Sequence, residues 1–267
     1  MIFRLARLFR LPLAVMNGIA ALGGYCLFPA PRNGVSMLIA FAGVTLLAMG
    51  GTALNQVLER DLDALMARTR QRPLPQGEMS PAAASCIGCG VTVAGAVLLF
   101  TAGGIRPVLL GLAALVWYLA VYTPLKRRSQ LALPLGAVSG ALPPMIGWSL
   151  AGGAAWDFRI VTLAGLFFIW QIPHFWLLQK RHAVDYRRAG IQLAVIRPGL
   201  FLLWVMALTA TALMLPAFGI IGQHTACWYA FFSALLLIMA LSHYEGSRFS
   251  CLNLFPMLVT VTLFMQR

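Results

Sequence analysis

Long apolar runs recur along the whole chain, and they limit its possible folds more than any other feature of the sequence. A helix needs about 20 consecutive apolar residues to cross the hydrocarbon core of a bilayer. Nine runs approach that length, and we predict one helical span for each. Inside lipid, only helices and closed barrels satisfy their backbone polar groups, so the sequence predicts an all-α, polytopic membrane bundle. The predicted spans cover residues 11–29, 35–58, 81–102, 105–122, 132–151, 158–179, 198–221, 225–243 and 250–266.

The composition agrees with a membrane protein. Of the 267 residues, 60% are hydrophobic and only 10% are charged, whereas about a quarter of a soluble domain is charged. No polar stretch is long enough for a separate domain, so we expect residues 1–267 to form a single integral-membrane domain. The N-terminal residues are expected to be a retained helix rather than a cleaved signal peptide. Cys86 and Cys89 have the spacing of a redox or metal pair, but they lie in an apolar run without a second pair, which favours a packing role.

The basic residues are confined to short segments between the apolar runs. Twenty Lys and Arg residues against seven Asp and Glu residues give a formal net charge of +13. No basic domain or basic patch interleaved with aromatic residues exists, so a nucleic-acid partner is not expected. With nine spans, one side of the membrane receives sixteen basic residues and the other four: Arg32, Arg106, Arg159 and Arg267. The positive-inside rule then places the N-terminus and the sixteen in the cytoplasm. Six of the seven acids share that side: Glu59, Asp61, Asp63, Glu78, Asp185 and Glu245.

The second span ends in a polar motif. Asn55, Glu59 and Asp63 are four residues apart, and on a helix such residues stack along one face, whereas Asp61 points elsewhere. Polar side chains near membrane depth normally face a cavity or the bundle interior. An amide and two carboxylates offer oxygen ligands, which suit Mg²⁺ shared with a phosphate group.

Basic residues follow this motif and recur after the fourth span. Arg68 and Arg72 are candidates for phosphate binding, because guanidinium forks match phosphate oxygens; for Arg70 a solvated position is the better interpretation. Tyr122 and Lys126 could hold an anionic group at the membrane boundary, although this motif taken alone favours an aromatic belt residue beside a topogenic charge.

The sixth span contains a second polar cluster. Gln171 and His174 flank Pro173 within an apolar run, and intramembrane polar residues indicate a functional site by default. If the helix continues, His174, Arg181 and Asp185 lie on one face. Asp185 would then bring a carboxylate to the same membrane side as Glu59 and Asp63. The alternatives are a loop acid paired with a neighbouring arginine, and a histidine bonded to a carbonyl that Pro173 frees.

These motifs together resemble the UbiA-type intramembrane prenyltransferases, and among them the branch that farnesylates haem. The resemblance covers roughly residues 50–195. It is carried by NQVLERDLDALMARTRQRPLPQG (55–77), YTPLKRRS (122–129), GAVSGALPPMIGW (136–148) and WQIPHFWLLQKRHAVDYRRAG (170–190). It implies a nine-helix bundle in a bacterial cytoplasmic (inner) membrane, dependence on Mg²⁺, and farnesyl diphosphate and haem b as substrates that give haem O. A haem A synthase or a terminal-oxidase assembly protein would be a possible partner.

The resemblance also implies roles for individual residues. Metal-bound diphosphate would be held from one side by Asn55, Glu59 and Asp63 and from the other by Asp185, with the three acids as Mg²⁺ ligands. The acceptor would meet His174 and Gln171. The diphosphate itself would be bound by Arg68, Arg72, Tyr122 and Lys126.

The chain departs from the pattern at two acidic positions. Glu59 stands where the motif usually has Asp, and Arg181 stands where other branches place a further acid. Acceptor identity therefore stays open to a UbiA-type enzyme that prenylates an aromatic or quinone-precursor acceptor. A transporter and a non-catalytic oxidase assembly factor are the alternatives from other classes.

Overall fold

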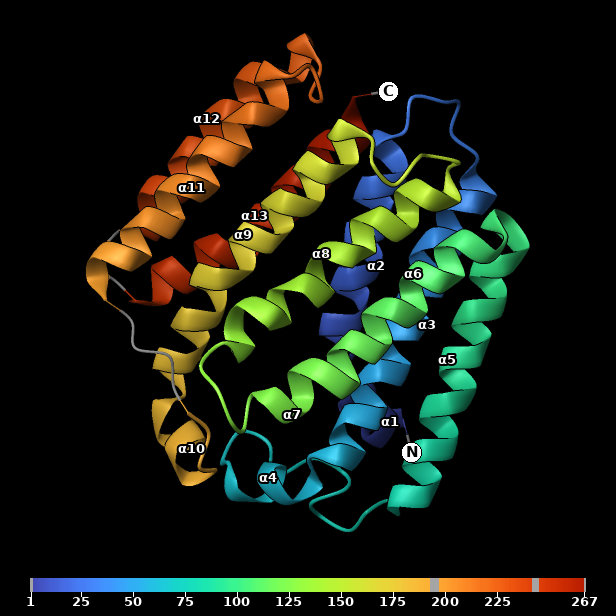
Figure 1. Cartoon of the computed structure of the whole chain (residues 1–267), viewed down its shortest axis with the longest axis vertical. Coiled ribbons are helices and arrows are strands. Elements are labelled where there is room, and N and C mark those ends of the chain that lie inside the picture. Colours follow the sequence, from blue (N-terminus) through green and yellow to red (C-terminus); the bar gives the residue numbers. More distant parts are fainter. Residues whose placement is uncertain (1, 193–196, 242–244, 267) are drawn as a thin grey trace.

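The computed structural model describes residues 2–192, 197–241 and 245–266, and within these ranges every regular element is a helix (Figure 1). Arg267, used in the charge count, lies outside the described residues, as do the end of the predicted span 225–243 and the side chains of Glu245 and Arg248. The long helices are α2 (Leu11–Leu27), α3 (Gly34–Leu58), α5 (Pro81–Gly103), α6 (Ile105–Val116), α8 (Ala132–Leu150), α9 (Phe158–Arg181), α11 (Pro198–Ala217), α12 (Gln223–Ala240) and α13 (Glu245–Met265). The short ones are α1 (Ile2–Phe9), α4 (Arg60–Leu65), the π-helix η1 (Trp117–Tyr122), α7 (Thr123–Leu125) and α10 (Ala183–Arg188).

The prediction of an all-helical membrane bundle is confirmed, while the count of nine spans stays a prediction. Six helices of the described chain are long and apolar enough to cross a membrane alone, and the bent pair α1–α2 makes a possible seventh. The helix α8 does not meet that test, and neither does the apolar part of α13, Phe249–Met265, which is shorter.

The position of α8 explains why it can be less apolar than the other long helices. It packs against α2, α6 and α9 in the middle of the bundle, so neighbouring helices rather than lipid surround it. Its glycines allow close contact: a Cβ added at Gly147 would lie 1.8 Å from the carbonyl oxygen of Ala21. Small residues at such crossings let helix backbones approach in membranes, where dispersion and hydrogen bonding replace the hydrophobic effect as the force between helices.

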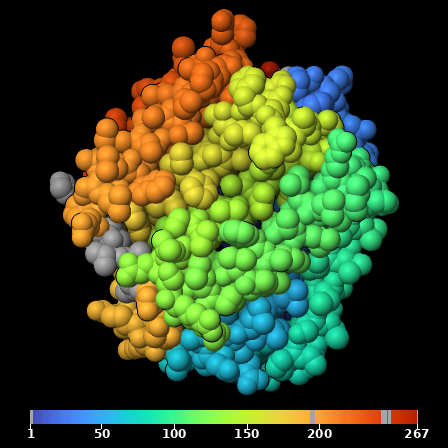
Figure 2. Space-filling view, viewed as in Figure 1, coloured from blue at the N-terminus to red at the C-terminus, as the bar shows by residue number. Residues whose placement is uncertain are grey.

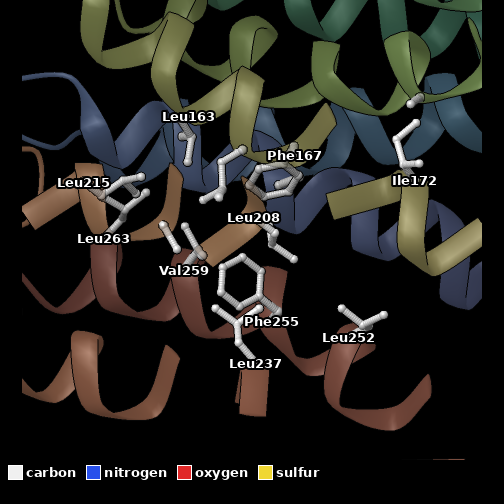
Figure 3. Close-up of a cluster of buried hydrophobic side chains, with 14 of the residues drawn as sticks. Leu163, Phe167, Ile172, Leu208, Leu215, Leu237, Leu252, Phe255, Val259 and Leu263 are labelled. Carbon is white, nitrogen blue, oxygen red and sulfur yellow. The ribbon is translucent and has the colours of Figure 1, made fainter. Parts of the chain in front are cut away.

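Two apolar clusters flank α8. One joins α9, α11, α12 and α13 through side chains such as Phe167, Leu208 and Phe255, which point toward one another in Figure 3. The other joins α2, α3, α5, α6 and α8, and it includes Val44, Leu47 and Ile146. These clusters fix the helices that surround the site.

The helices α1, α4, α7 and α10 gather at one end of the bundle, at the bottom of Figure 1. In the space-filling view, α4 and α10 form the lower edge and side chains fill most of the space between the ribbons (Figure 2). Asp63 lies on α4 and Asp185 on α10, while Glu59 and Lys126 lie at the ends of α4 and α7, so the fold brings the polar motifs to a single end of the molecule.

Candidate active site

A cavity of about 290 Å³ opens at this end between α2, α3, α6, α8 and α9. Most of the residues singled out from the sequence line it, although they come from three separate stretches of the chain, 55–72, 122–126 and 171–174. Asp185 does not line it, but its neighbour Tyr186 does. The lining residues among those predicted are Asn55, Glu59, Asp63, Arg68, Arg72, Tyr122, Lys126, Gln171 and His174.

The acidic motif lies at a break between two helices rather than on one continuous helix. Helix α3 ends at Leu58, Glu59 has non-helical dihedral angles (φ −114°, ψ 11°), and α4 begins at Arg60. The i→i−4 hydrogen bonds nevertheless continue, from Glu59 N to Asn55 O (3.0 Å) and from Asp63 N to Glu59 O (2.8 Å). The three side chains therefore stay on one face and are buried, while the Asp61 side chain is 92% exposed.

Each buried acid of this motif has a basic partner from another segment. Asp63 forms an ion pair with Arg72 (2.6 Å), and Glu59 forms one with Lys126. Burial lowers the pKa of Arg72 and of Lys126, and the adjacent carboxylates oppose that effect. Buried charges of this kind are stable only as pairs. The site therefore contains two carboxylates that could bind a cation and two basic groups that could bind an anion, and in this structure they are paired with each other.

The segment before Lys126 adopts π-helical geometry. Pro124 lacks the N–H group that a regular helix needs, and the π-helix η1 precedes it directly. Thr123 donates a hydrogen bond to Tyr118 O (2.8 Å) and accepts one from the Asn55 amide (2.9 Å). Single-turn π-helices often mark functional sites. Here the geometry links α3 to the segment that carries Tyr122 and Lys126, with the Lys126 ammonium 5.8 Å from the centre of the Tyr122 ring.

Asp185 links the α9–α10 segment to the loop that follows α4. Its carboxylate accepts hydrogen bonds from the backbone N–H groups of Ala67 (3.0 Å) and Arg68 (3.1 Å), and these bonds lower its pKa. The expectation that Arg181 and Asp185 lie together on one face of a continuing helix is wrong, because α9 ends at Arg181, whose guanidinium lies 5.3 Å from the centre of the Phe249 ring, while Asp185 on α10 faces the loop after α4. Asp185 is buried whereas Arg181 is exposed. Arg68 completes the junction, with its guanidinium 5.8 Å from the centre of the Tyr186 ring.

Whether the site suits a divalent cation can be judged from its oxygen atoms. Glu59 Oε1 is buried and has no hydrogen-bond partner within the described part of the chain. An unpartnered carboxylate oxygen facing Asn55 and Asp63 fits a hard cation with oxygen ligands. No three His, Cys, Asp or Glu side chains among the described residues converge closely enough to form a complete metal site. Such a cation would therefore need further oxygens from a bound phosphate group or water.

His174 lies on the wall of the cavity that α9 forms, within a stack of aromatic rings. Its ring lies 4.9 Å from that of Trp170 and 5.4 Å from that of Phe249, each at an interplanar angle of 24°. His174 Nδ1 is buried without a hydrogen-bond partner among the described residues, so it does not bond a carbonyl freed by Pro173. Gln171 donates to Ala137 O on α8 (3.3 Å) and thereby ties the two helices that border this part of the cavity.

Sequence reasoning missed Arg10. It lines the cavity and lies close enough to Arg72 and Lys126 to contribute to lowering the pKa of both. It is the one described non-glycine residue with positive φ (45°), at the 54° bend between α1 and α2. A left-handed residue of this kind is strained and often marks a functional site. The sequence signal was Pro12, since proline is favoured in the first turn of a helix and so places a break just before Leu11.

Hydrogen bonds from α3 hold this break in place. Gln56 donates to the carbonyl oxygens of Arg7 (3.0 Å) and Leu8 (2.7 Å), and Thr52 donates to that of Phe9 (2.8 Å). The last turn of α1 thus has partners for carbonyls that would otherwise be left unsatisfied.

Comparison with known proteins identifies the family. The UbiA prenyltransferase family model matches residues 17–251. The chain belongs to the UbiA prenyltransferase family. It is 56% identical to the protoheme IX farnesyltransferase of Geobacter sulfurreducens over 97% of each chain. It is 38% identical to that of Oleidesulfovibrio alaskensis, over 81% of this chain and 78% of the relative. Membership makes it a prenyltransferase and a multi-pass membrane protein.

Solved structures share the fold of this UbiA family member. An apo UbiA homolog from Aeropyrum pernix K1 superposes with a TM-score of 0.73 at 21% identity, over 95% of this chain and 98% of that one. A UbiA homolog from Archaeoglobus fulgidus bound to GPP and Mg²⁺ gives 0.72 at 15% identity, over 98% and 97%. At these identities the likeness establishes the architecture alone.

Proposed function

We propose that this chain transfers the farnesyl group of farnesyl diphosphate to a vinyl group of haem b, which gives haem O and diphosphate. The observation that carries the proposal is the 56% identity, over 97% of both chains, to a protein named protoheme IX farnesyltransferase. The geometry supports it, because one cavity combines paired acids and bases, an apolar interior and an aromatic shelf around His174.

The polar end of the cavity would bind the diphosphate. A divalent cation, for which Mg²⁺ is our assignment, would be held by Glu59 and Asp63 with Asn55 beside them and Asp185 across the junction, and it would stabilise the leaving diphosphate. Lys126 and Arg72 would then turn from their carboxylate partners to the phosphate oxygens. Arg68, Tyr122 and Arg10 would complete the anion site. Positive groups placed where negative charge develops supply the largest share of such catalysis.

The chemical step would break the C1–O bond of farnesyl diphosphate, and its electron pair would leave with the diphosphate. The vinyl π electrons of haem would form the new bond to C1 and leave a cation beside the porphyrin ring. Water would add to that cation and lose a proton, which gives a hydroxyethylfarnesyl substituent. The aromatic faces of Tyr118 and Tyr122, stacked at 5.8 Å between ring centres, would stabilise the farnesyl cation.

The wall formed by α9 would receive the acceptor. His174, held between Trp170 and Phe249, presents an imidazole with an unsatisfied nitrogen to a flat aromatic ligand. Gln171 would shape the same wall from the side of α8. We further propose that the polar end and the N-terminus face the cytoplasm of a bacterium, with the bundle in the inner membrane. A haem A synthase or an oxidase assembly protein would take the product.

The test is a product assay. The purified protein in lipid nanodiscs would be incubated with haem b, farnesyl diphosphate and Mg²⁺, and the extracted haem analysed by mass spectrometry. We expect the mass gain of one farnesyl group and one hydroxyl group, abolished by EDTA and in Asp63→Asn. Recovery of unmodified haem b, together with prenylation of 4-hydroxybenzoate in a parallel reaction, would assign the chain to a different acceptor.

A further inference from the structure

The cavity extends into a narrow apolar lobe between α3, α6 and α8, away from the polar end. Its walls include Ala48 and Gly51 on α3, and its deepest residues are Val44, Leu47 and Ile146, all at least 95% buried. These three belong to the apolar cluster that joins α2, α3, α5, α6 and α8, so the end of the lobe is part of the packed core. A packed end is a fixed boundary, because core side chains are held by neighbours on every side.

The length of this lobe follows from the rise of α3. At about 1.5 Å per residue, Leu47 lies roughly 12 Å and Val44 roughly 16 Å beyond Asn55, the deepest polar residue of the acidic motif. The main chain of a farnesyl group has twelve carbons and extends over about 14 Å at C–C bonds of ~1.5 Å, so a chain that starts level with Asn55 would end beside the Leu47 side chain, before Val44. A geranyl chain would end near Ala48, and a geranylgeranyl chain of about 19 Å would extend past Val44 into the core.

Glycines keep the lobe open at two depths. A Cβ added at Gly51 would lie 2.8 Å from Leu115 Cδ1, and one added at Gly111 would lie 2.5 Å from Leu47 Cδ1. The Leu47 side chain therefore rests directly against the backbone of α6. A single methyl group at position 111 would push it toward the lumen.

We propose that Leu47, seated against Gly111, ends the prenyl-binding lobe and limits the donor to a chain of farnesyl length. This inference rests on the proposed function and adds the residue that sets donor specificity.

The test uses binding rather than turnover. Non-ionising thiolodiphosphate analogues of geranyl, farnesyl and geranylgeranyl diphosphate would be titrated against the full chain in nanodiscs with Mg²⁺. For the unmodified chain we expect the farnesyl analogue to bind about tenfold more tightly than either of the others, since each buried methylene adds to affinity until the lobe is full. In Leu47→Ala the geranylgeranyl analogue should gain about tenfold over the farnesyl analogue. Leu47→Phe and Gly111→Ala should shift the preference to the geranyl analogue.

Leu99→Ala is the matched control. Leu99 is a fully buried leucine of the same apolar cluster and does not line the cavity. Its truncation should lower stability without changing the order of the three analogues. An unchanged order in both Leu47→Phe and Gly111→Ala would overturn the proposal. Failure of the proposed function would show differently, as analogue binding with a clear length preference but no prenylated haem.

Discussion

The segments α3–α4 and α9–α10 are built alike, but the buried aspartate of each is bonded to a different kind of group. Each is a long helix, a single non-helical residue and a six-residue helix; Glu59 (φ −114°, ψ 11°) and His182 (φ −116°, ψ 27°) have nearly the same dihedral angles. Each short helix turns an aspartate inward, Asp63 in one and Asp185 in the other. Asp63 is paired with a guanidinium, whereas Asp185 is bonded only to neutral backbone N–H groups. The same backbone arrangement thus places an ion-paired carboxylate in the first segment and, in the second, a carboxylate that holds the loop after α4 in position.

The largest expected effect lies in the first segment. Asp63→Asn removes a carboxylate from the cation site and leaves Arg72 without its partner, so we expect haem product to form about a thousandfold more slowly. The measurement is the initial rate at saturating substrates. The control is Asp61→Asn, because the Asp61 side chain faces solvent. A similar loss of rate in this variant would mean that the net charge of this end of the molecule, and not the carboxylate in the cavity, determines the rate.

A smaller loss is expected in the second segment. Asp185→Asn keeps one acceptor oxygen for the backbone of the 66–78 loop, so we expect the rate to fall about a hundredfold and the Mg²⁺ concentration for half-maximal activity to rise. Mg²⁺ titration of the initial rate measures both. If Asp185→Asn were more damaging than Asp63→Asn, the roles assigned to the two segments would be reversed.

The first segment is also hydrogen-bonded to the end of α1, next to Arg10. Arg10→Gln removes a cation from the diphosphate end, and we expect KM for farnesyl diphosphate to rise about tenfold while kcat changes little. Arg60→Gln, at an exposed arginine of the same end, should leave KM unchanged. An equal fall in kcat with constant KM would place Arg10 outside the anion site.

The smallest effect concerns His182, the non-helical residue between α9 and α10. Burial lowers the pKa of His182, and Arg68 and Arg181 lower it further. A group with a lowered folded-state pKa stabilises the fold above its unfolded value of about 6.5, and that stability is lost as the pH falls below it. Because His182 is only half-buried, Tm should fall by no more than about 1–2 °C from this cause between pH 7.5 and 5.5. His182→Gln should remove that part of the pH dependence in a thermal unfolding series, and an identical series would contradict it.

The sequence could predict contacts that follow from spacing along one helix. Asn55, Glu59 and Asp63 stay on one face because their i→i−4 hydrogen bonds survive the break at Glu59. Spacing did not predict the surroundings of Arg181 and Asp185, because Arg181 lies against the Phe249 ring whereas Asp185 bonds the backbone of the loop after α4. The hydrogen bonds from Ala67 and Arg68 to Asp185 join residues more than a hundred positions apart through backbone atoms, which carry no sequence signal. Arg10 was missed because a left-handed arginine has no residue pattern of its own.

The hydrogen bonds that fix α1 also set the order in which the molecule can assemble. Thr52 and Gln56 donate hydrogen bonds to carbonyl oxygens at the end of α1, and Glu78 pairs with Arg4 and Arg7. All three partners are translated after α1, and Glu78 follows α2, α3 and α4 in chain order. During synthesis the N-terminal helix must wait, undocked, until this part of the chain has left the ribosome. Helix α1 is made before these partners, and it therefore reaches its final position, and brings Arg10 into the cavity, only after the loop that follows α4 exists.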